Sequence, residues 1–278
     1  MTLLNKIIFI AFFLIVFQNA TAQQNLLDFD NSIKFARYLS ATQQLSFAVQ
    51  EYERLNYLWP NDSIVVLELV QTYRINNQCD KFYTSLKLLE NGGRLLKNSA
   101  YSSEYLRFTL TCRIKDQNYF EVLSYLKPEK KTFYEASYYW VNKQYDSLFK
   151  HYSKEKKLLA VANINLHDIT KSFSEQKYKS PLIASAMSVI VPGSGKAYSK
   201  RWGDALVSFL FVGTNAYASY RAFNKKGVKS VNGWIFGSLA VSFYSANIWG
   251  SAKAAKNYNN KLKETFQLNA ENIIYNSY

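Results

Sequence analysis

The sequence predicts an all-α protein, a solenoid of helix-turn-helix units followed by a C-terminal transmembrane helical hairpin with a short interfacial helix. Between residues 23 and 180 glycine and proline are scarce, and apolar residues recur at spacings of three and four, the period of amphipathic helices. Two mainly apolar stretches of about twenty residues follow, at 203–223 and 233–252, and each is long enough to cross a bilayer.

The first 22 residues predict a secretory signal peptide. Lys6 precedes an eleven-residue apolar run, Ile7 to Phe17, and Ala20-Thr21-Ala22 fits a cleavage site before Gln23. An uncleaved anchor is the alternative, and the Ala-x-Ala pattern disfavours it. The expected organisation is a signal peptide at 1–22, a helical-repeat domain at 23–177, a hairpin domain at 178–257 and a polar tail at 258–278.

The first complete helix pair is expected between Phe35 and Asp62. Two helical patterns meet near Thr42 to Gln44, and the second ends before Pro60 because proline cannot continue a helix. Later pairs are expected around 102–126 and 132–152.

The first pair resembles a tetratricopeptide repeat, which joins two helices in 34 residues. Ala48, Tyr52 and Pro60 hold the small, aromatic and proline positions of that family. One period later Phe82 replaces the small residue and Arg94 replaces the proline, so the array is degenerate. The resemblance implies a stacked solenoid whose surface binds protein partners.

Cys79 and Cys112 are the two cysteines of the chain. An oxidising compartment permits a disulfide between them. Two buried thiols are an equally open alternative, because the sequence does not place their Cα atoms within bonding reach.

The segment VPGSGKAYSKRWGDA raises the possibility of a phosphate-binding loop. That motif needs a glycine five residues before Gly195 and a hydroxyl after Lys196, where this chain has Ile190 and Ala197. The preceding run opens with Ser180-Pro181, which favours a helix over the required strand. The sequence therefore predicts a bend between membrane segments.

A short apolar helix at Leu182 to Val191 is expected before this bend, and two spanning helices after it. Asn215 and Asn247 are polar at membrane depth and are each expected to bond to a neighbouring helix. A pair of buried helices in a soluble domain is the alternative. A helix-packing stripe is predicted from small residues that recur every four positions, Ser238, Ser242, Ala246 and Gly250, and its partner is either the first span or a second copy of the chain.

Residues 181–257 resemble an uncharacterised family of small bacterial membrane hairpin domains. The matching residues are Pro192, Gly193, Gly195, Tyr198, Gly203 and Asp204. The resemblance implies a membrane location and brings no established chemistry. The glycines are expected to permit a tight bend, and Asp204 to favour the start of a helix.

The chain has a formal net charge of +14, and the last hundred residues are its most basic part. Residues 178–278 contain 12 Lys/Arg and 3 Asp/Glu. Because these basic residues flank apolar runs, phospholipid headgroups are the expected partner and nucleic acid is not. The segment Lys253 to Leu268 is expected to form a basic interfacial helix.

No catalytic, cofactor-binding or metal-binding residues are predicted. His151 and His167 are the only histidines, and neither has a partner at metal-ligand spacing. Both are expected on helix surfaces, and Asp168 is expected to point away from His167. No Gly-x-Ser-x-Gly elbow occurs.

The sequence thus predicts a non-catalytic adaptor in a bacterial inner membrane. Its helical repeats lie in the periplasm and bind protein partners, and the basic loop after Arg221 is cytoplasmic. A homo-oligomer formed through the hairpin is part of this prediction. The alternative is an oligomeric transport or channel component that uses the hairpin.

Overall fold

The computed structural model describes residues 27–60, 62–90 and 99–277, and all regular structure in these ranges is helical. The predicted all-α class is confirmed. The predicted signal peptide lies outside the described residues. Two compact units divide between Tyr134 and Glu135.

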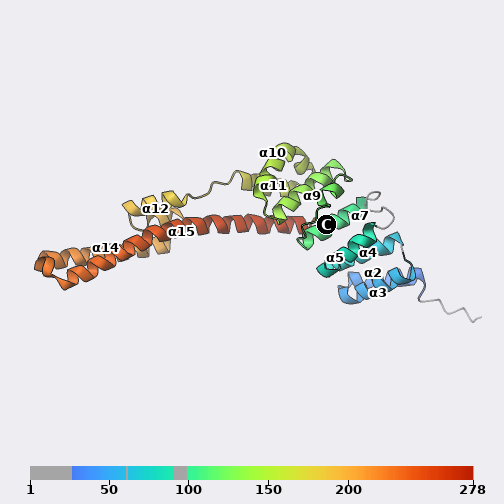
Figure 1. The fold of residues 1–278 in the computed structure, drawn as a ribbon, viewed down its shortest axis with the longest axis horizontal. Coiled ribbons are helices and arrows are strands. Elements are labelled where there is room, and N and C mark those ends of the chain that lie inside the picture. The colour runs from blue at the N-terminus through green and yellow to red at the C-terminus, as the bar shows by residue number, and fades with distance from the viewer. Residues whose placement is uncertain (1–26, 61, 91–98, 278) are drawn as a thin grey trace, which may run out of the picture. The chain divides into compact units, whose positions relative to one another are not determined.

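The first unit is built from consecutive helices that pack as antiparallel neighbours (Figure 1). They are α2 (Phe29–Ala41), α3 (Leu45–Leu58), α4 (Ser63–Ile75), η1 (Cys79–Lys81), α5 (Phe82–Glu90), α7 (Ser99–Thr111) and α8 (Tyr119–Leu123). The boundary between α2 and α3 falls at Thr42 to Gln44, as the sequence predicts. Of the repeat-signature residues, Ala48 and Tyr52 are buried, and Pro60 lies in the turn between α3 and α4.

One turn geometry recurs where the first helix of each pair ends. Its central residue is in the left-handed region, with φ between 53° and 61° at Gln43, Asn77, Arg113 and Lys143. These positions are separated by 34, 36 and 30 residues. In each turn the next residue's amide donates to a carbonyl five residues earlier, a pattern that satisfies the free carbonyls of a helix end.

Tyrosines bond to carboxylates both between and within helices. Tyr52 Oη on α3 donates to Glu68 Oε2 on α4 over 3.0 Å, and the half-buried Tyr139 donates through Oη to Glu135 Oε1, one turn earlier in its own helix, over 3.2 Å. Burial and the neighbouring negative charge raise the pKa of Tyr52 well above its ordinary value, and they raise the pKa of Tyr139 to about 12.

These raised pKa values predict a loss of stability in alkali. An unfolded tyrosine ionises near pH 10, whereas these folded phenols stay neutral at that pH. Their contribution is therefore complete below pH 10 and disappears as the pH rises from 10 to 12 and above. Thermal unfolding followed by circular dichroism is expected to shift downward across this range. Tyr52→Phe should flatten part of that dependence while costing about 1 kcal/mol at neutral pH.

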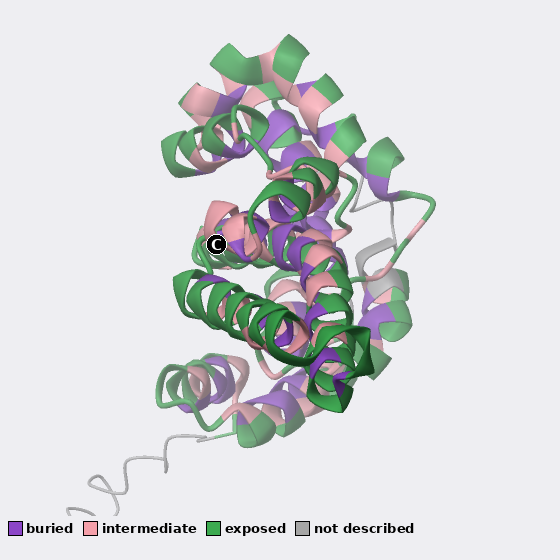
Figure 2. Cartoon of the chain, turned by 90° about the vertical axis from the view of Figure 1, so that its left-hand side faces the viewer, coloured by how far each residue is buried: buried purple, intermediate pink, exposed green. Residues whose placement is uncertain are grey.

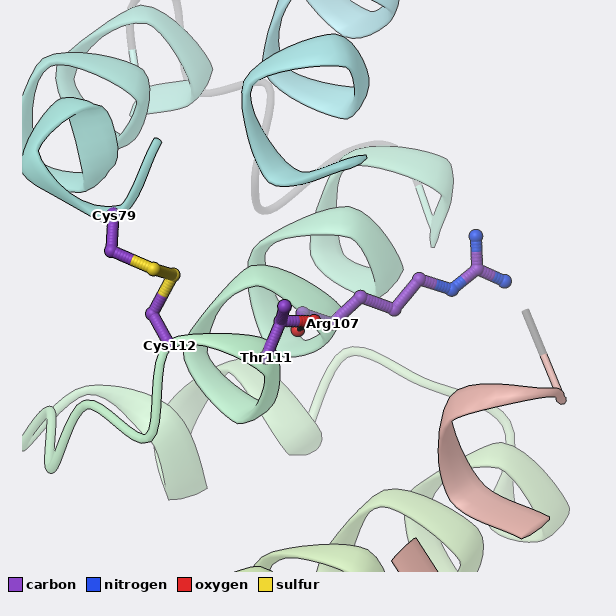
Figure 3. The surroundings of a disulfide bond; sticks show 4 residues. All are labelled: Cys79, Arg107, Thr111 and Cys112. Carbon is purple, nitrogen blue, oxygen red and sulfur yellow. Dashed lines mark hydrogen bonds between the residues drawn. A yellow bond between two sulfur atoms is a disulfide. The ribbon is translucent and has the colours of Figure 1, made fainter. Parts of the chain in front are cut away.

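Cys79 and Cys112 form a disulfide, with a Cα–Cα distance of 5.6 Å (Figure 3). Cys79 begins η1, and Cys112 directly follows α7, whose last residue Thr111 donates a hydrogen bond to the carbonyl of Arg107. The bond joins the turns that follow the first helices of two successive pairs, with Cys79 two residues after the left-handed Asn77 and Cys112 one residue before the left-handed Arg113. This resolves the alternative that the sequence left open.

The second unit contains three helices that pack on the C-terminal half of a very long one. The elements are the end of α9 (Pro128–Val141), α10 (Tyr145–Ala162), α11 (Ile164–Ser174) and α15 (Val231–Tyr275). Trp140 is fully buried against Phe173, which in turn contacts Phe266 at a ring-centroid distance of 5.2 Å. Gln267 Nε2 donates to the carbonyl of Trp140 over 2.8 Å.

The segment Lys253–Leu268 is helical as predicted, but it is part of α15, which is continuous over 45 residues. The prediction of a polar tail at 258–278 is wrong because α15 extends to Tyr275. Neither glycine nor proline occurs between Ser251 and Tyr275, so nothing breaks the helix. Ala270 and Ile274 are fully buried, which makes the end of the chain part of a packed core.

The remaining helices form the hairpin region. They are α12 (Pro181–Ile190), α13 (Ser194–Tyr198), α14 (Trp202–Lys226) and η3 (Gly227–Lys229). Helix α14 runs alongside the first half of α15, and α12 also packs against α15, above it in the view of Figure 1. The predicted spans 203–223 and 233–252 thus coincide with helices. None of the helices in the described part of the chain combines enough length and apolarity to cross a membrane.

Candidate functional site

The hairpin is held together by a seam of small residues at heptad spacing. On α14 the buried residues are Ala205, Val212 and Ser219, and on α15 they include Gly233, Ala240, Asn247 and Ala254. Each neighbour in either series is seven residues from the next. Ser219 Oγ donates to the carbonyl of Gly233 over 2.8 Å and fixes the antiparallel register. This spacing is typical of helices that cross at a shallow, left-handed angle.

The predicted packing stripe does not make this contact. Ser238, Ser242 and Ala246 are exposed, and Gly250 is half-buried against the side chain of Lys196. Residues spaced by four fall on successively different faces of an α-helix, whereas the seam residues, spaced by seven, stay close to one face. Of the two predicted partners of the stripe, the first span is therefore excluded, and a second copy of the chain stays a prediction.

The bend between α12 and α14 depends on two glycines. Gly193 has φ 91°, and a side chain there would overlap the backbone of Ala205. A Cβ at Gly195 would overlap the backbone carbonyl of Ala184. Gly203 has nothing within 4 Å of its Cβ position, so the bend does not require a glycine there.

A buried hydroxyl pair ties the bend to α12 and α15. Ser188 Oγ and Ser251 Oγ lie 2.7 Å apart, and the amide of Gly195 donates to Ser188 Oγ over 3.0 Å. Tyr198 Oη accepts a bond from the amide of Ser180 at the start of α12. The backbone amide that a phosphate loop would present at Gly195 is thus engaged within the protein.

The charged residues of the motif have different surroundings. Asp204 lies in the first turn of α14 and forms an ion pair with Arg201, in keeping with its predicted place at a helix start. Lys196 points between helices instead, where its Nζ donates to Ser208 Oγ over 2.6 Å. Lys196 is one of the twelve basic residues of 178–278 that were expected to face headgroups, and its inward position differs from that expectation.

The two asparagines differ from expectation. Asn215 Nδ2 donates to the carbonyl of Phe211 in its own helix over 2.7 Å. Asn247 is only 3% exposed, and neither Oδ1 nor Nδ2 has a hydrogen-bond partner. The prediction that each bonds to a neighbouring helix is wrong, because a local carbonyl satisfies the first and the small-residue seam offers the second no partner.

The outward-facing surface of the hairpin is apolar. No charged residue occurs between Ala205 and Tyr220 or between Ser230 and Ala252. Exposed residues are green in Figure 2. The large apolar ones are Leu206, Val207, Phe209, Leu210, Phe211, Tyr217 and Tyr220 on α14, and Trp234, Ile235, Phe236, Leu239, Val241, Phe243 and Trp249 on α15. Soluble monomers rarely expose a contiguous apolar surface of this extent.

Basic grooves lie at both ends of this apolar surface. One, of about 660 Å³, is lined by Lys200, Arg201 and Lys261 next to Tyr258. The other, of about 500 Å³ at the hairpin tip, is lined by four basic side chains, Arg221, Lys225, Lys226 and Lys229.

The histidines are not simple surface residues. His151 is buried, with Nδ1 3.4 Å from Glu135 Oε1. His167 Nδ1 lies 2.9 Å from Asp168 Oδ1, and its Nε2 lies 3.1 Å from Tyr152 Oη. The expectation that Asp168 points away from His167 is wrong, because the two side chains lie within hydrogen-bond distance of each other. Among the described residues, no group of three or more histidine, cysteine or acidic side chains is placed to hold a metal ion.

Comparisons of the chain with protein-family models, with curated proteins and with solved structures give no match.

Proposed function

We propose that this protein is a non-catalytic adaptor whose hairpin is embedded in a bacterial inner membrane and whose helical repeats bind protein partners. The observation that carries the proposal is the uncharged apolar surface on the outward faces of α14 and α15. Water would have to cover this surface in a soluble monomer, whereas lipid tails cover it without cost.

The polar residues of the hairpin are compatible with lipid because their bonding groups are used internally. Thr214 Oγ1 donates to the carbonyl of Leu210, and Ser245 Oγ donates to the carbonyl of Val241. Ser219 points into the seam. These residues lower the mean hydropathy of each helix, yet they leave few free polar groups on the outer surface.

The dimensions and the ends of the hairpin support the same conclusion. The uncharged stretches 205–220 and 230–252 correspond to about 24 and 35 Å of helix, which bracket the ~30 Å hydrocarbon core. Trp202 and Trp249 are exposed at one end and Trp234 at the other, as in the aromatic belts of membrane proteins. The basic grooves would then face the headgroups of the two leaflets.

The proposed orientation places both chain ends in the periplasm and the Arg221–Lys229 tip in the cytoplasm. A cleaved signal peptide and two crossings give this arrangement, and the basic tip agrees with the positive-inside tendency. The exposed stripe at Ser238, Ser242 and Ala246 is the surface through which we propose self-association.

We propose that the helix pairs are tetratricopeptide-like repeats. The recurring turn at 34- and 36-residue intervals and the buried Ala48 and Tyr52 support this. Phe35 and Tyr38 on α2 and Tyr57 on α3 are exposed aromatic residues, the kind that anchor protein interfaces. Capture of a partner by the full chain, lost on Tyr38→Ala and Tyr57→Ala, is the test of this surface.

Membrane anchoring is tested by extraction of cell membranes with alkaline carbonate. We expect the full-length protein to stay in the membrane pellet and Leu210→Lys to release a large part of it, because a charge at the centre of a span opposes insertion. Phe47→Lys is the matched control, since Phe47 is 60% exposed and Leu210 is 49% exposed. Release of the unaltered protein by carbonate would contradict the anchor.

A further inference from the structure

A small cavity lies between α13, α14 and α15 at the end of the hairpin that carries the glycine bend. It has a volume of about 210 Å³. Lys196, Ser208 and Asn247 supply its polar wall, and Val207, Phe211 and Phe243 supply its apolar wall. The two phenylalanine rings lie 5.3 Å apart in an edge-on arrangement.

The polar wall has unused bonding capacity. Lys196 Nζ makes one bond, to Ser208 Oγ, and an ammonium group has three donors. Asn247 is 3% exposed and has two amide donors and a carbonyl oxygen without partners. Leaving such a group unpaired costs about 1–3 kcal/mol, so its retention here requires an explanation.

Lys196 is the one charged residue among those that line the cavity. The neighbouring carboxylate, Asp204, is paired with Arg201 on the outside of the bend. Lys196 therefore presents a positive charge at the cavity. Asn247 lines the same cavity with its amide atoms enclosed in the seam, so these atoms meet a ligand once the side chain turns toward it. A cation and neutral donors in a partly dry site favour an oxyanion, and the free amide oxygen favours a hydroxyl or amine next to that anion.

We propose that this cavity binds the phosphate group of a phospholipid, with Lys196 and the Asn247 amide as the phosphate ligands. The headgroup hydroxyl or amine is accepted by Asn247 Oδ1, and the first part of an acyl chain packs against Val207, Phe211 and Phe243. The site lies at the same end of the hairpin as Trp202 and Trp249, the level of lipid phosphates if the hairpin is embedded. It rests in this respect on the proposed membrane location.

The test measures binding to the full-length protein in detergent through its intrinsic tryptophan fluorescence. The probes are dihexanoyl phosphatidylglycerol below its micelle concentration, dihexanoylglycerol and inorganic phosphate. We expect the phospholipid to bind, the diacylglycerol not to bind and inorganic phosphate to bind more weakly. Lys196→Met should weaken phospholipid binding about tenfold, as expected for one charge-assisted contact. Lys171→Met, which removes an equal charge from α11 outside the cavity and both basic grooves, should change it less than twofold.

Asn247→Leu is a second variant, which distinguishes the loss of a ligand contact from misfolding. It removes a buried amide without partners and keeps a similar volume, so we expect a higher Tm together with phospholipid binding weakened several-fold. Equal binding by the protein and by Lys196→Met, or equal binding of dihexanoylglycerol, would overturn the site. Tight binding of inorganic phosphate alone would overturn the lipid and leave a free oxyanion as the ligand.

The outcomes also separate this site from the anchor. Carbonate release with intact phospholipid binding removes the membrane proposal and keeps the cavity. Retention of the protein in membranes, together with phospholipid binding that Lys196→Met does not weaken, would keep the membrane proposal and remove the cavity.

Discussion

Gly193→Ala is expected to lower the free energy of unfolding by about 4 kcal/mol. Gly193 has φ 91°, where an L-residue costs roughly 1–2 kcal/mol, and the added Cβ would overlap the backbone of Ala205. Overpacking against atoms that cannot rotate away costs about 1–3 kcal/mol more. The measurement is the thermal midpoint of the full chain in detergent, which should fall by roughly 10 °C.

Gly203→Ala is the matched control for that experiment. Gly203 belongs to the same sequence motif, but its Cβ position has no neighbour within 4 Å and it lies in the first turn of α14. Alanine there should leave the midpoint unchanged or raise it slightly, because alanine favours a helix more than glycine does. Equal losses at both positions would mean that the bend does not have this geometry.

Loss of the disulfide is expected to destabilise the first unit by about 4 kcal/mol. Cys79 and Cys112 are 33 residues apart, and closing a loop of that length removes this much conformational entropy from the unfolded chain. Replacing both cysteines by serine, or adding a reductant, should lower the thermal midpoint recorded by far-ultraviolet circular dichroism to a similar degree.

The single variants provide the internal check. Cys79→Ser and Cys112→Ser each break the same bond, so each should lose about as much stability as the double variant, and their effects should not add. A reductant should then have no further effect on any of the three. Additive losses would show that packing, and not the cross-link, is being measured.

Much of the helical framework follows from apolar spacing. The boundary at Thr42 to Gln44 could be placed because two periodic patterns fall out of phase there. The recurring left-handed turn could not, because Gln43, Asn77, Arg113 and Lys143 share no glycine that would mark it. The disulfide stayed open because its formation depends on how separate helices approach each other.

At the candidate site, the sequence located the bend and missed the contacts across it. Gly193 and Gly195 can be recognised in the sequence because they are glycines. The heptad seam is harder to recognise, because the small residues of the stripe recur just as regularly on another face of α15. The end of α15 was read as a tail because the composition becomes polar after Lys253. Helix continuity depends on the absence of breaking residues, and the packing of this end of the chain depends on partners more than a hundred residues earlier, such as Trp140 for Gln267 and Asn163 for Ser277.

The continuity of α15 has a consequence for the order of biosynthesis. Trp140 and Phe173 leave the ribosome long before Phe266 and Gln267, which close over them. Until translation ends, that layer has an open apolar side, and at 5–20 residues per second the wait lasts several seconds or more. A nascent chain of this protein therefore needs protection for its middle section, and a stop codon in place of Phe266 would leave the section permanently uncovered.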